Sequence, residues 1–371
     1  MLSSLILYFV VYTLLLGVII TVGFFLQRQK ERGYIKSEQK IDPKELVVLI
    51  PFRNEAHRIQ DLLDNIQQLK TLPRSFVFID DHSTDNTVDL INQSLKGTDH
   101  EVIHLPESIS GKKRALRYGT EHSQSKYILT MDADVVVDVD YFAAISELGE
   151  ADMYVLPAIM KSKKWVEHFY EIDLILVTAA NAGLAGLARP IMASGANLLY
   201  KRSTFSDVDN VESHIHAASG DDTYLLRDFR EHKKDVRLLT DPKCGITTET
   251  PQSFREFIDQ RLRWIGKTGD IKDSLSTTLV ILQAILTIVF FGLIIWTVIL
   301  GDWKLLGILF GLKSVTDLVL FYPYFARIKR LSSWIYIPIY ELLFPIYTLL
   351  ILALVFTYKP KWKGREIYTK E

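Results

Sequence analysis

The stretch ILTMDADVVVD, residues 128–138, sets an apolar run against two carboxylates that one alanine separates. Residues 128–131 have the composition of a buried strand. Asp132 and Asp134 follow at the point where that strand should end. Two like charges placed so close repel each other, so their position at the end of a buried strand needs a physical reason.

Strand-like and helix-like segments alternate around this stretch. ELVVLIPF (45–52), SFVFID (75–80) and HEVIHLP (100–106) predict three further strands, and segments of helical period follow them. This alternation predicts an α/β fold with a mainly parallel sheet and helices on both faces. In such sheets ligands bind at the carboxyl ends of the strands. Asp80 and Asp81 end one predicted strand, and Asp132 and Asp134 end another.

The order of elements suits a nucleotide-binding fold, but the glycine-rich phosphate loops are missing from the sequence. Neither G-x-G-x-x-G nor G-x-x-x-x-G-K-[ST] occurs. Asp132 and Asp134 could instead hold a divalent metal, Mg²⁺ or Mn²⁺, whose open positions bind phosphate oxygens. A lone D-x-D triplet more often lies in a solvated loop. The metal prediction therefore depends on the position of this triplet directly after a predicted strand.

Two further motifs each allow two interpretations. SGDDTYLL puts Asp221 and Asp222 before an apolar helical stretch, where they could cap the helix or one could act as a general base. QRLRW (260–264) could anchor the chain at a membrane interface. It could equally clamp a phosphate with an arginine and offer tryptophan as a platform for a sugar ring.

Composition limits the class of protein. The chain has 371 residues, 48% of them hydrophobic, and a formal net charge of −1. That charge gives no reason to expect nucleic-acid binding. The single cysteine, Cys244, cannot form an internal disulfide, which favours a reducing compartment.

Apolar segments at both ends predict an integral membrane protein. Leu5 to Leu26 carries no charged side chain, and basic residues follow it at once, which predicts a cytoplasmic location from residue 27 onward. A cleaved signal peptide is the alternative, but its basic residues would come first. Further apolar segments lie at 277–300, 305–325 and 334–357. The predicted parts are a transmembrane helix (1–27), a globular domain (37–275), C-terminal membrane helices (276–357) and a basic cytoplasmic tail (358–371).

Four full spans would return this basic tail to the outside, against the positive-inside rule. We therefore expect one terminal segment to be interfacial or re-entrant. Residues 334–357 are the candidate, because Pro338 and Pro345 should break the first half of a helix there. Lys313 and Asp317 stand four residues apart in another segment. They should pair with each other, although a substrate role remains the alternative for charges inside a membrane.

Taken together in one fixed order, the motifs resemble those of a known family. The chain resembles the inverting nucleotide-sugar glycosyltransferases of family 2, which have the GT-A fold, and especially the membrane-embedded synthases with a D, D, D, QxxRW pattern. The resemblance covers roughly residues 46–266. It rests on IPFRNE (50–55), DDHSTDNT (80–87), GKKRAL (111–116), DAD (132–134), SGANLLYKR (194–202), GDD (220–222) and QRLRW (260–264).

The resemblance implies a role for each matching residue. Asp222 would be the catalytic base, and Asp132 and Asp134 the metal ligands. The nucleotide-sugar would be bound by Pro51, Glu55, Asp80, Asp81, Lys112 and Asp132. The acceptor and the diphosphate would meet Gly195, Asn197, Asp221, Gln260, Arg263 and Trp264. The family often has asparagine two residues before the glycine of GKKRAL, whereas this chain has Ile109, so a diphosphate contact differs there.

These roles imply a membrane-bound glycosyltransferase with a lipid-linked or polysaccharide acceptor. An inverting transfer needs one base, and a metal and an arginine to stabilise the departing diphosphate. A non-catalytic membrane scaffold with the same fold is one alternative, but a scaffold would not need all the carboxylates. A metal-dependent phosphohydrolase is another, and the sequence lacks the histidine-rich cluster that it would favour.

Overall fold

The computed structural model describes residues 2–208, 221–271, 273–358, 361–362 and 365–366, and the chain divides into two compact units. The first, here the helical unit, comprises Met1–Gln27, Ser162–Ile191 and Thr250–Ile367. The second, here the sheet unit, comprises Arg28–Lys161, Met192–Glu249 and Tyr368–Glu371. The units therefore do not follow chain order, because residues 162–191 interrupt the sheet unit. Most of the predicted basic tail, 358–371, lies outside the described residues.

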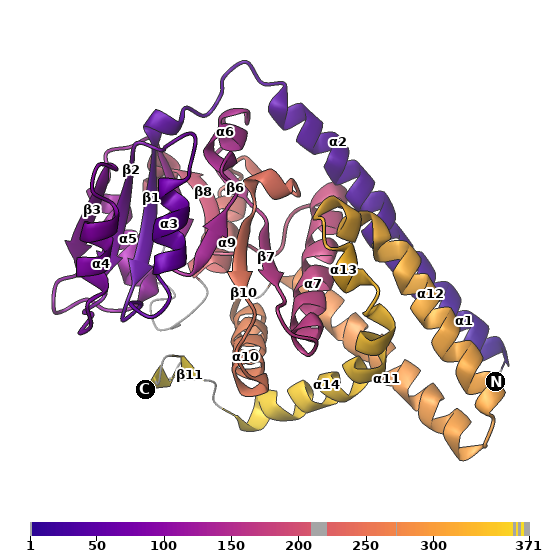
Figure 1. Cartoon of the computed structure of the whole chain (residues 1–371). Coiled ribbons are helices and arrows are strands. Elements are labelled where there is room, and N and C mark those ends of the chain that lie inside the picture. The colour runs from indigo at the N-terminus through magenta and orange to yellow at the C-terminus, as the bar shows by residue number, and fades with distance from the viewer. Residues whose placement is uncertain (1, 209–220, 272, 359–360, 363–364, 367–371) are drawn as a thin grey trace. The chain divides into compact units, whose positions relative to one another are not determined.

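A seven-stranded sheet forms the centre of the sheet unit (Figure 1), with the strand order β3-β2-β1-β4-β8-β6-β9. The four predicted strands are present, and β1 to β4 pair in parallel. Because these strands pair in parallel, the predicted mainly parallel sheet is confirmed. The next strand, β8, pairs antiparallel with β4. The strands are β1 (Leu46–Phe52), β2 (Ser75–Asp80), β3 (His100–His104), β4 (Tyr127–Met131), β6 (Met153–Val155), β8 (Asn197–Lys201) and β9 (Val236–Leu238).

Helices cover both faces of this sheet because side chains alternate along each strand. Val48 and Ile50 belong to the main core cluster with Leu63 of α3. On the other face, a Cβ added to Gly119 of α5 would lie 2.5 Å from Ile79, so α5 packs closely on the sheet there. The helices of this unit are α3 (Gln60–Gln67), α4 (Thr87–Ser94), α5 (Lys112–His122), α6 (Tyr141–Ser146), α8 (Arg202–Val208) and α9 (Asp221–Glu231).

A second, three-stranded sheet has the order β5-β10-β7. Its strands are β5 (Val135–Val137), β7 (Ala158–Lys161) and β10 (Ile246–Glu249). β5 begins one residue after Asp134, so the two carboxylates of the opening stretch lie between a strand of the large sheet and a strand of the small one. Strands on both sides fix the backbone that carries them.

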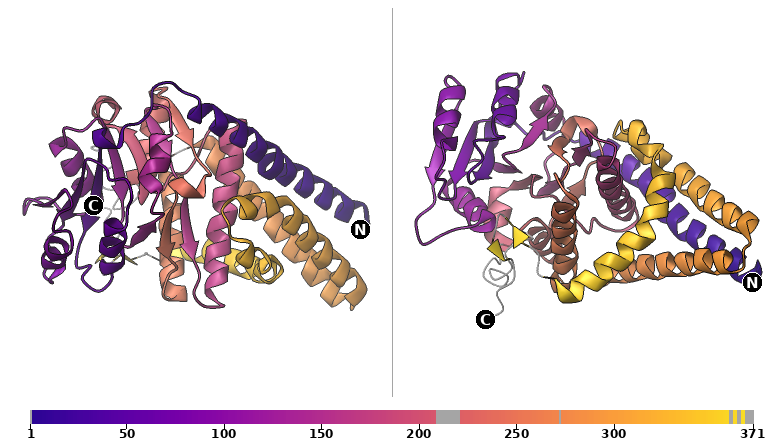
Figure 2. Two further views of the ribbon diagram at one scale, coloured as in Figure 1. Left: turned by 45° about the horizontal axis from the view of Figure 1, so that its top comes forward. Right: turned by 60° about the horizontal axis from the view of Figure 1, so that its bottom comes forward.

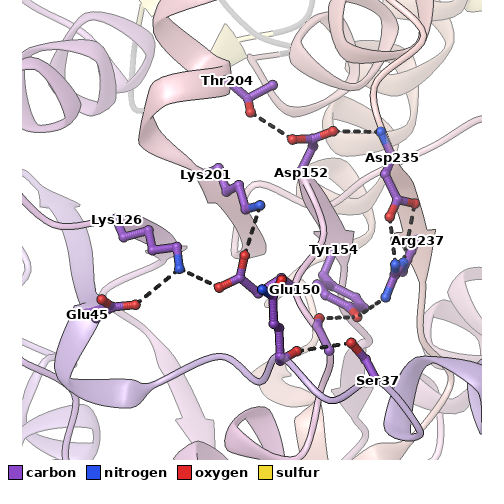
Figure 3. Close-up of polar contacts among 12 residues, drawn as sticks. Ser37, Glu45, Lys126, Glu150, Asp152, Tyr154, Lys201, Thr204, Asp235 and Arg237 are labelled. Atoms are coloured by element: carbon purple, nitrogen blue, oxygen red, sulfur yellow. Dashed lines mark hydrogen bonds and ion pairs between the residues drawn. The ribbon is translucent and has the colours of Figure 1, made fainter.

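A polar network joins strands at the opposite edge, where β4 begins (Figure 3). Glu150 binds Lys126 and, at 3.2 Å, Lys201, which pairs across the sheet with Tyr127. Two residues further on, Asp152 accepts hydrogen bonds from Thr204 at 2.8 Å and from the backbone of Asp235. These contacts stabilise the sheet away from its ligand-binding edge.

The remaining helices lie in the helical unit (Figure 2), except that the helix Phe24–Ile35 belongs to it only as far as Gln27. Several of them are long and apolar. Among the residues that the structure describes, five helical segments are long and apolar enough to cross a membrane: Leu7–Ile35, Glu167–Leu187, Ser274–Ile299, Trp303–Arg327 and Ile337–Val355. Four of them overlap the apolar segments predicted from the sequence. The fifth is α7 (Glu167–Leu187), whose acidic residues conceal its apolar character. The others are α1 (Leu2–Leu16), α2 (Phe24–Ile35), α10 (Phe254–Ile271), α11 (Ser274–Ile299), α12 (Trp303–Arg327), α13 (Leu331–Trp334) and α14 (Ile337–Thr357).

Glycines allow α7 to approach the first apolar helix at backbone distance. Between α1 and α2 the chain forms a π-helical stretch, Gly17–Gly23. A Cβ added to Gly23 would lie 2.3 Å from the carbonyl oxygen of Gly183, and one added to Gly186 would lie 1.8 Å from that of Gly23. Because real Cβ atoms do not come this close to backbone, only glycine fits these positions.

The predicted break in the last apolar segment is wrong. Helix α14 runs without interruption from Ile337 to Thr357. Pro338 lies in its first turn, where a missing N–H leaves no hydrogen bond unmade. Pro345 is accommodated inside the helix. Length and composition thus allow this segment to span a membrane like the others.

The expected pair of charges on α12 forms, and a third charge joins it. Lys313 binds Asp317 at 2.6 Å and also binds Glu341 of α14. Tyr12 of α1 donates a hydrogen bond of 2.7 Å to the other oxygen of Asp317. The cluster therefore connects three apolar helices.

Candidate active site

Asp132 and Asp134 lie directly after β4 and each meets a cation. Lys112, the first residue of α5, forms an ion pair with Asp132. Arg58 binds Asp134, with Nη1 2.9 Å from Oδ2. Two side chains from different parts of the sheet unit thus pair with the two carboxylates.

The two carboxylates influence each other. Burial, and then the repulsion of Asp132, raise the pKa of Asp134 above its usual range, while Arg58 acts in the opposite direction. Arg58 is itself held by Glu55, which accepts from its Nε and, at 3.1 Å, from its Nη2. Glu55 thus orients the cation that neutralises Asp134.

The donor atoms of this pair fit a divalent metal. Carboxylate oxygens are the ligands that Mg²⁺ and Mn²⁺ prefer, and a dication would relieve the repulsion between Asp132 and Asp134. In the described part of the chain, no group of three or more His, Cys, Asp or Glu side chains is arranged to hold a metal. A metal held by two carboxylates would keep positions open for phosphate oxygens.

Asp80 and Asp81 end β2, and their side chains have different surroundings. Asp80 accepts hydrogen bonds from the backbone of Ser83 and lies 2.9 Å from His104 on β3. Asp81 uses one oxygen to accept from the backbone of Gly111 at 3.0 Å. Its other oxygen is buried and has no hydrogen-bond partner among the described residues. Asp81 is therefore the better candidate to accept a hydrogen bond from a ligand.

The loops after β1 and β2 are held in an unusual backbone conformation. Asn54 and His82 both have a left-handed backbone, with φ of 53° and 59°. Asn54 accepts a hydrogen bond of 2.8 Å from the backbone of Thr84 and donates one from its own backbone to Ser83. Because each loop fixes the other, the acidic edge of the sheet is preorganised.

The loop before α5 also depends on backbone geometry. Gly111 has a φ angle of 98°, which residues other than glycine rarely adopt. At Ile109, where the family often has asparagine, the backbone carbonyl contacts His82 Nε2 at 2.8 Å. The loop that carries Lys112 is thus tied to the end of β2 through the backbone.

Asp222 lies beside Lys112 and Gly195. Its Oδ2 accepts a hydrogen bond of 2.9 Å from the backbone of Gly195, and its Oδ1 accepts from Thr223. A Cβ added to Gly195 would lie 3.6 Å from both Asp222 Oδ2 and Lys112 Nζ. Because Lys112 also binds Asp132, the structure brings the predicted base and one predicted metal ligand to a single location.

Asn197 does not line an acceptor site, and this part of the prediction is corrected. The residue is fully buried. Its amide nitrogen donates to the carbonyls of Pro157 and Cys244, and its oxygen accepts from Tyr141. All of its polar atoms are used in holding β8, so Asn197 is structural.

The other predicted residues divide between the units. Pro51 is part of β1 and pairs with Ile79 across the sheet. Asp221 is the first residue of α9, but its side chain and Gly220 lie outside what the structure describes. Gln260, Arg263 and Trp264 lie on α10, in the helical unit. Burial lowers the pKa of Arg263 below its usual range.

Arg58 is the residue that sequence reasoning missed. It lies three positions after Glu55, in the turn between β1 and α3, and binds a predicted metal ligand. A carboxylate and an arginine three residues apart after a strand were the available signal. Many such pairs lie on solvated turns, so the spacing alone did not identify it.

Comparisons with known proteins identify the domain that contains these residues. The family model described as glycosyl transferase family 2 matches residues 47–208, which include β1 to β4 and the D-x-D pair. Poly-beta-1,6-N-acetyl-D-glucosamine synthase of Staphylococcus aureus (strain COL) is 24% identical over 285 residues, 73% of this chain and 67% of the relative. The synthase of the same name from Staphylococcus epidermidis is 22% identical over 270 residues, 70% of this chain and 63% of the relative.

A solved structure shows the same fold along most of the chain. It is a mannosyltransferase from Pyrobaculum calidifontis, in complex with GDP-Man and Mn²⁺. The two share 16% sequence identity, with a TM-score of 0.51, and the match covers 89% of this chain and 97% of the other. The chain therefore contains a glycosyl transferase family 2 domain over residues 47–208, and it has the predicted GT-A fold.

Proposed function

We propose that the protein is a membrane-bound inverting glycosyltransferase that moves a sugar from a nucleotide-diphospho-sugar to a lipid-linked or polysaccharide acceptor. The observation that carries this proposal is that Asp222 and Lys112 both lie beside Gly195 and that Lys112 forms an ion pair with Asp132. A carboxylate, a cation and a D-x-D pair at the ligand-binding edge of an α/β sheet are the groups that such a transfer needs.

Asp222 is the proposed general base. Inverting transfer requires one group that removes the proton of the acceptor hydroxyl as the nucleoside diphosphate departs. The hydrogen bond from Gly195 fixes one oxygen of Asp222, and those from Thr223 orient the other. A carboxylate held from both sides cannot rotate freely, which favours a single angle of approach to the acceptor.

Lys112 and Arg58 are the proposed donor-side cations. Both now neutralise the D-x-D carboxylates, and both could turn toward phosphate oxygens when a donor binds. Asp132 and Asp134 would hold Mg²⁺ or Mn²⁺, which when bound supplies positive charge for the departing diphosphate. The mannosyltransferase named above was solved with Mn²⁺, which supports the choice of metal.

Asp81 is the proposed contact for the nucleoside. Its buried oxygen, unpartnered among the described residues, could accept a hydrogen bond from a ring N–H of a base. The names of the staphylococcal relatives make UDP-N-acetylglucosamine the first donor to test. GDP-mannose is the second, because the solved relative binds it.

We propose a cytoplasmic location for the sheet unit. Arg28, Lys30 and Arg32 follow the first apolar helix, which favours the inner face of the membrane by the positive-inside rule. The apolar helices suit an acceptor that is a lipid or that must cross the bilayer.

The test is label transfer by the purified full chain. UDP-, GDP- and dTDP-sugars with a labelled sugar are each incubated with membrane lipid extract, with and without Mn²⁺ and excess chelator. We expect label in lipid or polymer from one donor, and none in chelator. Nucleoside diphosphate release that does not depend on the extract would favour a hydrolase. Donor binding without turnover of any kind would favour the scaffold.

A further inference from the structure

Arg261 of QRLRW is buried in the helical unit and contacts several side chains there. Its guanidinium carbon lies 4.1 Å from the ring centre of Trp264, one turn further along α10. Its Nη1 lies 3.5 Å from the side-chain oxygen of Gln260. Arg261 therefore touches two of the three motif residues that the family resemblance assigns to substrates.

Arg261 is itself held by two other helices. Its Nε donates to Asp173 of α7, and the other oxygen of that carboxylate accepts a hydrogen bond of 2.9 Å from the hydroxyl of Tyr340 on α14. All three side chains are buried. The carboxylate is thus satisfied on both sides, and the guanidinium plane cannot rotate without breaking an ion pair.

This arrangement suits arginine in particular. A planar guanidinium can stack on an indole while one edge binds a carboxylate, whereas the compact ammonium of lysine cannot satisfy both contacts in the same way. Arg261 also lies 4.8 Å from the ring of Phe257 on the other side of the helix turn, so it is stacked between two aromatic residues.

We propose that Arg261 is a positioning residue: with Asp173 and Tyr340 it sets the indole of Trp264 in the orientation that the acceptor requires. The inference rests on the proposed function and on the expectation from the sequence that Trp264 is a platform for the acceptor sugar. It adds residues of α7 and α14 to the residues proposed to serve transfer. Helix α14 lies outside the 47–208 family match, and α7 lies within it but carries none of the motifs that define the resemblance.

The alternative is that the same contacts only hold α7, α10 and α14 together. In that case any weakening of the ion pair should lower stability and activity together. A positioning role makes a different prediction, because its effect on transfer passes through Trp264 and should vanish when Trp264 is gone.

The variants remove single contacts. Tyr340→Phe deletes only the hydroxyl that binds Asp173, and Arg261→Lys keeps the charge but loses the stacked plane. Tyr322→Phe is the matched control, since it deletes a hydroxyl from an exposed tyrosine of another apolar helix. Each is made in the wild-type chain and in a chain that carries Trp264→Phe.

Initial rates of label transfer to membrane lipid extract give the first readout. We expect Tyr340→Phe to lower the rate by roughly threefold to tenfold and Arg261→Lys by about tenfold or more, as coupled neighbours do. In the Trp264→Phe chain each should add less than about twofold, because residues that act through one another are not additive. If either substitution lowered the rate by the same factor in the Trp264→Phe chain as in the wild-type chain, the proposal would be overturned.

Fluorescence gives a second readout that needs no activity. The difference in emission between each chain and its Trp264→Phe counterpart isolates Trp264, and acrylamide quenching reports how that indole is held. Tyr340→Phe and Arg261→Lys should increase quenching of Trp264, and Tyr322→Phe should not. Unchanged quenching would overturn the proposal. If the wild-type chain transfers no label, the proposed function fails, and quenching alone decides whether Arg261 positions Trp264.

Discussion

Asp80 and Asp81 end β2 side by side, yet their carboxylates meet different partners. Asp80 contacts the backbone of Ser83 and the ring of His104, so both of its oxygens serve the fold. Asp81 contacts Gly111 with one oxygen, and the other is buried without a partner in the described part of the chain. A buried acceptor left in this state is stabilised when a ligand supplies a donor.

Asparagine substitutions separate the two residues. Asp81→Asn should lower affinity for the uridine or guanosine nucleotide by roughly tenfold to a hundredfold, as loss of a charged hydrogen bond does, with little change in melting temperature. Asp80→Asn should instead lower the melting temperature. Nucleotide titration by calorimetry, with melting curves of the same samples, measures both. Equal effects of the two variants on affinity would contradict the assignment.

At the residue scale the sequence predicts which chemistry is present better than which residue performs it. The carboxylates after β2 and β4 follow from strand ends alone. The partners of Asp134 and Asn197 do not, because Arg58 and Tyr141 reach them from segments that the sequence does not place nearby. Asn197 matches a family motif and is nevertheless entirely occupied by the fold.

At the element scale, the glycines between α7 and the first apolar helix set the distance between two backbones. Gly186→Ala would push a Cβ against the carbonyl of Gly23, so one helix must move. We expect a loss of about 1–3 kcal/mol, the usual range for overpacking. Gly311→Ala on α12 is the control, because no described atom lies within 4 Å of its added Cβ. Melting in detergent should fall only for Gly186→Ala. Equal melting of both variants would contradict the close packing.

The network at the start of β4 predicts a pH-dependent contribution to stability. A hydrogen bond from Lys126, and then one from Lys201, lower the pKa of Glu150 below its ordinary value of 4.5, against the opposing effect of burial. Because the folded pKa is depressed, this stabilisation is present above about pH 4.5. It is lost as the pH falls through the folded pKa.

Glu150→Gln should therefore destabilise the protein at neutral pH by about 1 kcal/mol or less, since solvent screens Lys126. Below the folded pKa of Glu150, the variant and the wild type should converge. Melting temperatures of both proteins between neutral and acid pH check this. A difference that stays constant over the whole range would show that Glu150 acts by packing alone.

Elements were predictable where one signal dominated. The strands of the parallel sheet and four apolar helices follow from their periodicity and length. Helix α7 does not, because Glu171 and Asp173 interrupt its apolar run and are buried only through partners on other elements. The continuity of α14 through Pro345 was also beyond local rules, since neighbouring contacts decide whether a helix tolerates proline.

At the scale of the whole molecule, the two compact units divide the proposed work. The sheet unit carries the proposed base, the D-x-D pair and the proposed donor-side cations. The helical unit carries QRLRW and the apolar helices. Residues 162–191 interrupt the sheet unit and belong to the helical one, so the chain passes between the units several times.

The most direct test of the proposed function compares the wild-type chain with Asp222→Asn in one experiment. Both are incubated with the labelled donor and membrane lipid extract, and binding of the unlabelled nucleotide-sugar is measured in parallel. We predict that the variant loses transfer by about 10²–10⁴-fold, the usual worth of a general base, while it binds the donor as the wild type does. Transfer that survives in Asp222→Asn, or transfer and binding lost together in a folded variant, would contradict the account.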